Sequence, residues 1–435
     1  MAEMTIEILR LEGRMTDIET DMESRDFFKD EALFVDPHPY YDYIRAQCPV
    51  QQEPFHNVFM VTGFDEAMEV YSNPTTWSSC NTVAGPGFPV SLEGDDVSDL
   101  IDQHRDELPF SDQLPSFDPP KHTVQRGLLM RLITPKRMKE NEDFMWGLAD
   151  RVMDEFLDKG TCEFVTEYAN PYTLLVVADL LGVPEADFEK IRLRMTIKPA
   201  ERPLGKHDHK PLEYLYEQFT EYIEDRRRRP RDDVMTSLAN ASFPDESTPP
   251  VHDVALIAAN LFAAGQETTV RLLVASLRML GERPDLQEML RRDRQRIPQF
   301  VEEMLRLETP IQGSFRLARR NTTVGGVDLP AGSTVFVSPG AANRDPRHFE
   351  NPDLFELERP NGRQHLAFAH GIHTCAGAPL ARAEARVTLE RFLDRVTDIR
   401  ISESAHGAAG DRHYDYIPTY FLQGLMNLHV EFTPI

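Results

Sequence analysis

One cysteine of this chain lies in a stretch that suits a metal ligand. Cys375 is followed by Gly377 and then by residues 378–386, whose composition is typical of a helix with Pro379 in its first turn. The free N–H groups and the dipole of a helix N-terminus favour an anion, so we expect the sulfur to be a thiolate. A thiolate in a tight glycine turn, shielded on one side by Phe368, could bind a metal ion. The alternative is an ordinary buried cysteine.

The spacing around the cysteine favours the first interpretation. Phe368-x-x-Gly371-x-His373-x-Cys375-x-Gly377 closely resembles the haem-binding signature of the cytochromes P-450, the haem-thiolate monooxygenases. The resemblance implies that Cys375 is the axial ligand of haem iron and that Phe368 and Gly377 contact the cofactor. It also implies haem b (iron protoporphyrin IX) as the cofactor and O₂ as a co-substrate. The implied fold is mainly α with small β-sheets, a single large helical domain whose haem is buried between a long central helix and the cysteine loop.

A long apolar stretch predicts that central helix. It runs from Val254, after Asp253 as the expected cap, to about Leu280. Within it, Ala-Gly-Gln-Glu-Thr-Thr is locally unfavourable for a helix. A threonine hydroxyl there can displace a helical hydrogen bond, and an acid beside it can relay protons. The alternative is a packed helix with a polar notch.

The same notch resembles the oxygen-activation motif of the family. The resemblance implies that Glu267 and Thr268 are the catalytic acid and alcohol, and that Ala264 and Gly265 lie against the haem. Small residues at these positions would let a flat ligand approach the helix. This motif distinguishes monooxygenase chemistry from simple haem binding.

Further positions take their expected roles from the resemblance. Glu303 and Arg306, three residues apart on one helix face, match a structural ion pair near the thiolate side of the haem. Arg344 or Arg359 could join that pair. Four basic side chains match contacts to the haem propionates: His122, Arg126, Arg316 and His373.

Residues 78–116 differ from their surroundings. They contain a Gly-Pro-Gly-Phe-Pro run and an acidic stretch at 93–107, which indicates an irregular segment. It could be a solvated surface loop or a flexible lid over a substrate pocket. An apolar pocket would suit a terpenoid, steroid, aromatic or fatty ligand. The candidate pocket residues are Val83, Phe88, Phe262, Ile311, Tyr420 and Phe421.

Composition limits the remaining classes. The chain has 435 residues and a formal charge of −25, which argues against nucleic acid or an anionic membrane as a partner. No run of 18 apolar residues and no signal-peptide pattern occurs, so we expect a soluble cytoplasmic protein. Residues 1–24 are predicted to be a mobile tail and residues 25–435 the haem-thiolate domain. Four scattered cysteines argue against disulfides and zinc: Cys48, Cys80, Cys162 and Cys375.

The resemblance further implies that electrons come singly from a separate ferredoxin or flavodoxin with its reductase. Such partners are acidic, so we expect a basic patch on the cysteine face. Three alternatives stay open. A peroxide-driven peroxygenase usually replaces the acid–alcohol pair, a haem sensor or electron carrier does not need it, and a structural protein without haem would be colourless. The residues proposed for the patch are Lys121, Arg126, Arg131, Lys136, Arg137, Arg363 and Arg382.

Overall fold

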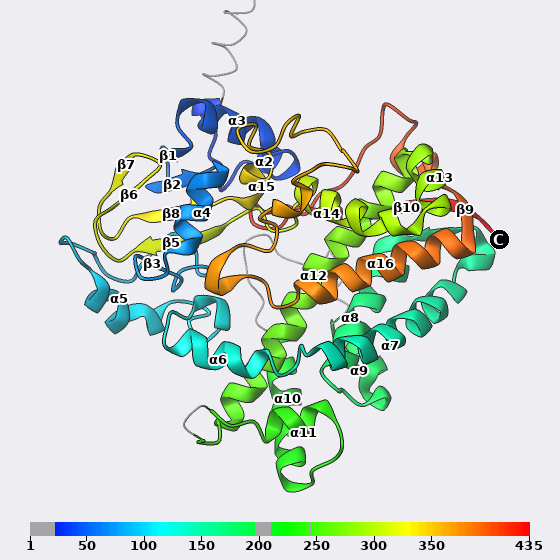
Figure 1. The fold of residues 1–435 in the computed structure, drawn as a ribbon, viewed down its shortest axis with the longest axis horizontal. Coiled ribbons are helices and arrows are strands. Elements are labelled where there is room, and N and C mark those ends of the chain that lie inside the picture. The colour runs from blue at the N-terminus through cyan, green and yellow to red at the C-terminus, as the bar shows by residue number, and fades with distance from the viewer. Residues whose placement is uncertain (1–21, 196–209, 244–245) are drawn as a thin grey trace, which may run out of the picture.

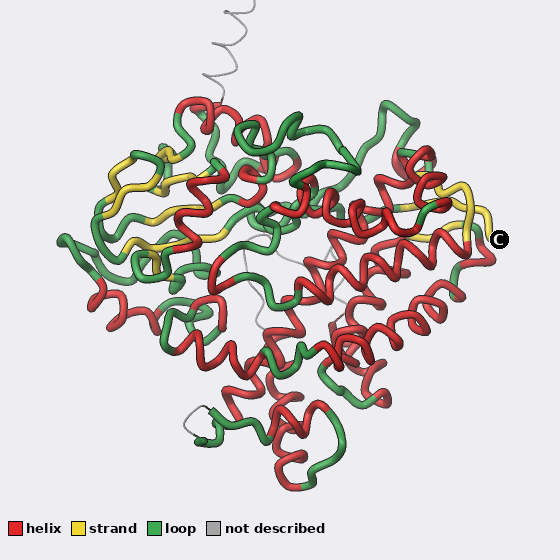
Figure 2. Tube along the Cα trace, in the orientation of Figure 1, coloured by secondary structure: helices red, strands yellow, loops and turns green. Residues whose placement is uncertain are grey.

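Helices dominate the architecture, and the largest sheet lies at one end of it. The computed structural model describes residues 22–195, 210–243 and 246–435. Figures 1 and 2 show this sheet on the left and the helical region on the right, with the small β4-β10-β9 sheet at the far right beside the C-terminus and the long helix α12 running through the helical region. The mainly α fold with small sheets is therefore confirmed. The predicted tail, residues 1–24, lies outside the described residues except for its last three.

The helices, in chain order, are α2 (Glu31–Val35), α3 (His38–Gln47), α4 (Phe64–Ser72), α5 (Ser98–His104), α6 (Lys121–Leu129), α7 (Pro135–Asp154), α8 (Asn170–Leu180), α9 (Phe188–Met195), α10 (Lys210–Arg228), α11 (Val234–Ala239), α12 (Val251–Glu282), α13 (Pro284–Arg292), α14 (Ile297–Leu307), α15 (Pro339–Ala342), α16 (Ala378–Arg395) and α17 (Glu403–His406). The strands are β1 (Val50–Gln52), β2 (Val58–Val61), β3 (Trp77–Ser78), β4 (Thr161–Glu163), β5 (Ser314–Ala318), β6 (Thr322–Val324), β7 (Val327–Leu329), β8 (Thr334–Val337), β9 (Val396–Ile401) and β10 (His429–Pro434).

The largest sheet is covered on both faces. Its strand order is β1-β2-β8-β5-β3, with β2 and β8 parallel and the other pairs antiparallel. Side chains alternate between the faces of a strand. In β8, Val335 and Val337 pack with Phe64 and Val70 of α4, whereas Phe336 packs with Phe27 on the opposite face. A strand covered on both faces reads as a continuous apolar run, as β8 does.

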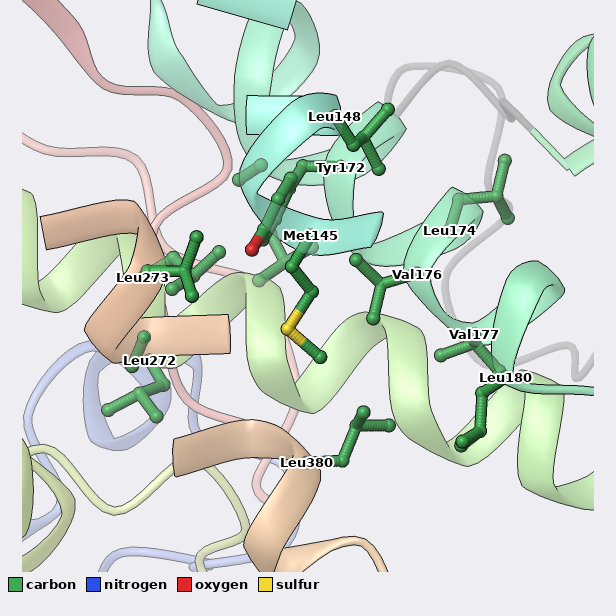
Figure 3. Packing of buried hydrophobic residues seen from close by; sticks show 14 of the residues in the cluster. Met145, Leu148, Tyr172, Leu174, Val176, Val177, Leu180, Leu272, Leu273 and Leu380 are labelled. Atoms are coloured by element: carbon green, nitrogen blue, oxygen red, sulfur yellow. The ribbon is translucent and has the colours of Figure 1, made fainter. Parts of the chain in front are cut away.

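The central helix α12 organises the helical region. It spans 32 residues and packs against α8, α10 and α16. Figure 3 shows this packing, where Leu272 and Leu273 of α12 share a core with Met145 of α7, Tyr172 of α8 and Leu380 of α16. No helix in the described parts of the chain is both long and apolar enough to cross a membrane.

Two predictions of local structure were incomplete. The helix α12 begins at Val251 after Pro250, and Asp253 accepts a hydrogen bond from Gln125 Nε2 at 3.1 Å instead of capping the helix. Residues 78–116 are not wholly irregular, because α5 forms within the acidic stretch. Val97 and Ile101, four residues apart, bury one side of α5 in a small apolar cluster, and this stabilises the helix despite its charges.

Candidate functional site

The middle of α12 is open to solvent although both of its halves are buried. Most side chains at 254–262 and 269–277 are buried, whereas Ala263 and Ala264 are exposed and Glu267 and Thr268 are half-buried. A helix that is buried on both sides of an exposed turn leaves room for a ligand at that turn. The exposed residues are small, which allows a flat group to lie close to the backbone.

Cys375 lies in the loop that leads into α16, which packs against α12. The residue as a whole is exposed to solvent. The backbone of Cys375 donates to the carbonyl of Phe368 at 2.9 Å, and this hydrogen bond closes the loop. The helix then begins at Ala378 with Pro379 in its first turn, as predicted.

Two opposing influences act on the ionisation of this cysteine. Burial raises the pKa of the Cys375 thiol, whereas the N–H groups of Gly377 and Ala378 and the charge of Arg126 act to lower it. The helix N-terminus thus favours the thiolate as expected, but desolvation opposes it. A bound metal ion deprotonates a coordinating thiol directly, so binding of a metal would supply the missing stabilisation.

Two histidines and an arginine meet beside the cysteine loop. The ring centroids of His122, from α6, and His373 lie 4.2 Å apart, and Arg126 donates a hydrogen bond to the carbonyl of Thr374. His373 Nε2 lies 3.0 Å from the hydroxyl of Ser79. Both ring nitrogens of His122 are buried without a hydrogen-bond partner among the described residues. Such groups normally have one, so His122 points to a missing ligand.

The basic residues beside the cysteine loop also lack an anionic partner among the described residues. Burial, and then Arg126, lowers the pKa of His122 to about 4, and burial, and then Arg316, lowers that of His373 to about 3. The guanidinium of Arg316, on β5, is buried and donates to the Thr82 hydroxyl at 2.6 Å and to the Phe315 carbonyl at 2.7 Å. Within the described residues it forms no ion pair with a carboxylate. A buried cation of this kind requires an anion.

These observations fit a haem. Two propionates would satisfy His122 and neutralise Arg126 and Arg316, as charge-assisted hydrogen bonds do. The exposed small residues of α12 would accept the flat face of the macrocycle, and the sulfur of the exposed Cys375 could bind iron. The structure thus brings His122, Arg126 and His373 together at the cysteine loop, and it packs α12 against α16, the helix that follows Cys375.

The acid–alcohol pair has defined partners. The Thr268 hydroxyl donates to the carbonyl of Ala264 at 3.0 Å, which is the bond to the preceding helical turn that a threonine can form. Glu267 Oε1 lies 2.6 Å from Nη2 of Arg271, one turn further along α12. The sequence analysis did not single out Arg271, although its spacing of four residues from Glu267 was a usable signal.

The predicted ion pair of Glu303 and Arg306 is present. Arg306 donates to both carboxylate oxygens of Glu303 at 2.8 Å, and Arg359 donates to one of them at 3.0 Å. Arg344 instead pairs with Asp353. All three members of the Glu303 cluster are buried. The cluster ties α14 to the segment before the cysteine loop.

A second buried pair near the loop was missed. Glu302, next to Glu303, binds Arg382 of α16 at 2.6 Å and His365 at 3.1 Å. His365 and then Arg382 lower the pKa of Glu302 to about 2 against the opposing effect of burial, which is the largest single contribution. The Arg382 guanidinium stacks over the Phe368 ring at 4.6 Å. Such a cation–π contact holds the ring that was expected to shield Cys375.

Three predicted site residues have other surroundings. Phe262 is fully buried, with its ring 6.1 Å from that of Phe219 of α10. Tyr420 packs in an aromatic cluster, with its ring 4.9 Å from that of Phe28. A Cβ on Gly265 would lie 3.0 Å from Val177 of α8, so this glycine serves the approach of two helices.

The other predicted pocket residues are consistent with partial access. Val83, Phe88, Ile311 and Phe421 are all half-buried. Phe88 packs on the same small cluster as α5, and the backbone carbonyl of Phe421 accepts from Gln312 N at 2.9 Å. A Cβ on Gly377 would lie 3.8 Å from the Cys375 sulfur, which is an ordinary van der Waals contact, so Gly377 lies directly beside the sulfur. The contacts of Ser79 and Thr82 with the basic residues had no signal in the sequence.

Comparisons with known proteins agree with this geometry. The sequence model of the family Cytochrome P450 matches residues 184–397. The chain is 32% identical to cytochrome P450 144 of Mycobacterium tuberculosis, over 87% of this chain and 86% of the relative. It is 30% identical to 6-deoxyerythronolide B hydroxylase of Saccharopolyspora erythraea, over 84% of this chain and 90% of the relative.

Solved structures extend the likeness to the whole fold. Substrate-free CYP150A6 of Mycobacterium marinum superposes with a TM-score of 0.90 at 53% identity, covering 95% of this chain and 99% of that one. CYP109E1 of Bacillus megaterium in complex with testosterone superposes with a TM-score of 0.76 at 28% identity, covering 91% and 99%. The likeness of sequence and fold explains three features of the site: the open turn of α12, the cysteine loop and the unsatisfied basic groups. This chain belongs to the cytochrome P450 family of haem-dependent monooxygenases.

Proposed function

We propose that this enzyme inserts one atom of O₂ into an apolar small molecule at the exposed turn of α12, with haem b bound through Cys375. The observation that carries the proposal is the set of buried basic groups without an anion, placed beside an exposed cysteine. The haem, when bound, supplies the activation of O₂. The chain's own residues hold it, keep water from it and deliver protons.

Each group at the site has a role in this proposal. His122, Arg126, Arg316 and His373 bind the propionates, and the ring of Phe368 covers the sulfur. Glu267 and Thr268 hold and move protons at the exposed turn, where the Thr268 hydroxyl can exchange its bond to Ala264 for one to water. Retention of this pair favours use of O₂ over use of peroxide alone.

The substrate class is proposed from the half-buried residues around the turn. Val83, Ile311 and Phe421 present apolar surface. Relatives act on or bind large apolar molecules, as the names 6-deoxyerythronolide B hydroxylase and the complex of CYP109E1 with testosterone state. We therefore propose a terpenoid, steroid, aromatic, fatty or macrolide-like ligand for this chain.

An absorption titration tests both the haem and the pocket. The purified protein, expressed with added haem precursor, is titrated with testosterone, corticosterone, 6-deoxyerythronolide B and representative terpenes and fatty acids. A Soret band that shifts from low to high spin with one class would support the proposal, because a substrate displaces water from iron. Two results together would refute the proposal: the soluble wild-type protein shows no Soret band, and the absorption spectrum of Cys375→Ala is the same as that of wild type.

We also propose that a separate ferredoxin or flavodoxin donates the electrons at the cysteine face. Of the proposed patch, Arg137 is held by Asp179 and Arg382 by Glu302. Lys121, Arg131, Lys136 and Arg363 are exposed and can meet an acidic partner. The rate of reduction should fall as salt rises, since exposed charges are screened beyond about 10 Å at 0.1 M salt.

A charge-neutral variant of this face makes that test specific. Arg363→Gln should slow reduction by the partner at low salt and should reduce the salt dependence. The matched control is Arg228→Gln, another exposed arginine at the end of α10, a helix that packs against α11 and α12. Equal effects of the two variants, or a rate independent of salt, would contradict docking at the cysteine face.

A further inference from the structure

Arg271 contacts two parts of the molecule that lie far apart in the sequence, the exposed turn of α12 and the segment around Leu425. It lies on α12, four residues after Glu267, and only 5% of its surface is exposed. One terminal nitrogen lies 2.6 Å from Glu267 Oε1. The other donates a hydrogen bond to the backbone carbonyl of Leu425. A single guanidinium therefore bridges the acid of the exposed turn and the C-terminal segment.

That segment is an irregular hairpin beside the proposed pocket. Tyr416 pairs with Leu425 and Ile311 with Leu422, and Ile417 N donates to the Gly424 carbonyl at 3.0 Å. The backbone of Phe421, a half-buried candidate pocket residue, lies between these pairings. Whatever moves the hairpin also moves the carbonyl that Arg271 holds.

The hairpin is shaped to receive the Arg271 side chain. A Cβ on Gly424 would lie 2.4 Å from Cδ of Arg271 and 2.9 Å from its Cγ. These atoms belong to the middle of the side chain, so they cannot move aside without displacing the guanidinium. The glycine at this position is thus explained by the arginine that packs on it.

We propose that Arg271 is a positioning residue that orients the carboxylate of Glu267 and couples it to the hairpin of residues 416–425. The inference rests on the proposed role of Glu267 in moving protons. The planar guanidinium holds its nitrogens in a fixed geometry. Because one terminal nitrogen is held by the Leu425 carbonyl, the other approaches Glu267 Oε1 from a defined direction. A ligand that presses on the hairpin through Phe421 would thereby change the orientation of the acid.

The fate of oxygen in the substrate-free holoenzyme reports on this coupling. With a ferredoxin and its reductase, O₂ takes two electrons and two protons to give hydrogen peroxide, or four of each to give two water molecules. The peroxide formed per O₂ consumed is therefore lower when the second pair of protons and electrons arrives more often. The measurement needs no identified substrate.

Arg271→Gln should raise the peroxide fraction, and so should Glu267→Gln. Arg271→Lys should raise it less than Arg271→Gln does. The double variant should match Glu267→Gln alone, because Arg271 acts through that carboxylate. Gly424→Ala should reproduce Arg271→Gln without changing any charge. Soret absorbance and thermal melting of each variant show whether the haem and the fold are retained.

Arg278 provides a matched control on the same helix. It binds Glu308 at 2.8 Å and the hydroxyl of Tyr416, at the base of the same hairpin, at 3.3 Å. Arg278→Gln removes another contact between α12 and the hairpin, but the described contacts of Arg278 do not include Glu267, so the peroxide fraction should stay at the wild-type value. An equal rise in Arg278→Gln would show a general effect of the hairpin and would overturn the inference.

Hydrogen exchange gives a readout other than activity. If Arg271 links the two sites, Glu267→Gln should speed amide exchange in residues 416–426, and it should have no further effect when Arg271 is already Gln. Unchanged exchange in Glu267→Gln and an unchanged peroxide fraction in Arg271→Gln would overturn the inference. If neither Glu267→Gln nor Thr268→Ala changes the peroxide fraction, the proposed function of the acid–alcohol pair fails instead.

Discussion

Two glutamate–arginine pairs on neighbouring helices resemble each other in sequence and differ in the structure. Glu267 and Arg271 lie one turn apart on α12, and Glu303 and Arg306 lie one turn apart on α14. The Glu303 carboxylate is 2% exposed and receives hydrogen bonds from Arg306, Arg359 and the backbone of Glu356. The Glu267 side chain is 28% exposed.

The difference shows how surroundings decide what a carboxylate can do. A buried ion pair whose hydrogen bonds are all satisfied cannot lose a partner without leaving a charge in a medium of low polarity. It therefore acts as a structural clamp. A carboxylate with access to solvent can change partners at little cost, which proton transfer requires. The spacing of the residues in sequence is almost the same in both cases.

Breaking the buried pair should have the largest effect. Glu303→Gln leaves the guanidinium groups of Arg306 and Arg359 buried without their anion, so we expect a loss of about 3–5 kcal/mol in the free energy of unfolding. Little soluble, haem-loaded protein should form. The measurement is chemical denaturation, together with the Soret absorbance per mole of protein.

A surface pair supplies the control for that experiment. Glu358 binds Arg296 at 2.9 Å and its side chain is 76% exposed. Glu358→Gln should change the free energy of unfolding by no more than about 0.5 kcal/mol. A Glu303→Gln variant as stable as this control would mean that the buried cluster is not a clamp.

The open site should tolerate substitution but lose its chemistry. Thr268→Ala removes a half-buried hydroxyl that bonds only within its own helix, so the fold and haem content should be unchanged. The product formed per NADH consumed should fall, with peroxide formed in its place, because protons no longer reach the site through this hydroxyl. Peroxide and product are measured together in the reconstituted system.

The adjacent threonine makes this prediction specific to position. Thr269 is buried and points about 100° away around the helix. Thr269→Ala should keep the product yield per NADH close to that of wild type. If Thr268→Ala kept the wild-type yield, the assignment of Thr268 as the catalytic alcohol would be wrong. The comparison of the buried Glu303 pair with the open site would then have no functional consequence.

The sequence was sufficient where the signal is local. The turn before α16, the apolar length of α12 and the spacing of Glu303 and Arg306 all follow from residues close together in the chain. Helix periodicity and the position of Pro379 report directly on backbone conformation. The structure places these elements close to where they were expected.

Contacts between distant segments could not be predicted from the residues alone. Arg359 meets Glu303 across 56 residues, and Ser79 meets His373 across 294. An apolar side chain in a helical pattern is expected to be buried, but the pattern does not say against what. Phe262 therefore lies in the helical core rather than at the site. The thiol of Cys375 shows the same limit, because the desolvation that raises its pKa arises from the fold.

A third carboxyl group extends the comparison to a case with no cation. Glu384, on α16, is fully buried, and neither of its oxygens has a hydrogen-bond partner among the described residues. Burial raises the pKa of this carboxyl well above its ordinary value and so favours its neutral form in the folded protein. Its environment is the opposite of that of Glu303, whose carboxylate accepts hydrogen bonds from two arginines.

The pH dependence of stability should reveal this neutral acid. In the unfolded chain Glu384 releases its proton near pH 4.3, whereas the folded protein retains it, so the unfolded state binds fewer protons above that pH. The contribution of Glu384 to stability is complete below this pH and is lost as pH rises toward its folded pKa. Glutamine cannot titrate. The stability of Glu384→Gln relative to wild type should therefore increase between pH 5 and pH 8, by at most about 1.4 kcal/mol per pH unit.

Denaturation of both proteins at several pH values in this range gives that difference directly, and subtraction removes the titration of all other groups. A relative stability independent of pH would mean that Glu384 is ionised in the folded protein. An ionised Glu384 would need a cation or water that the described residues do not provide. The conclusion that neighbouring groups set the ionisation state of each buried carboxyl would then fail for the carboxyl that has no described hydrogen-bond partner.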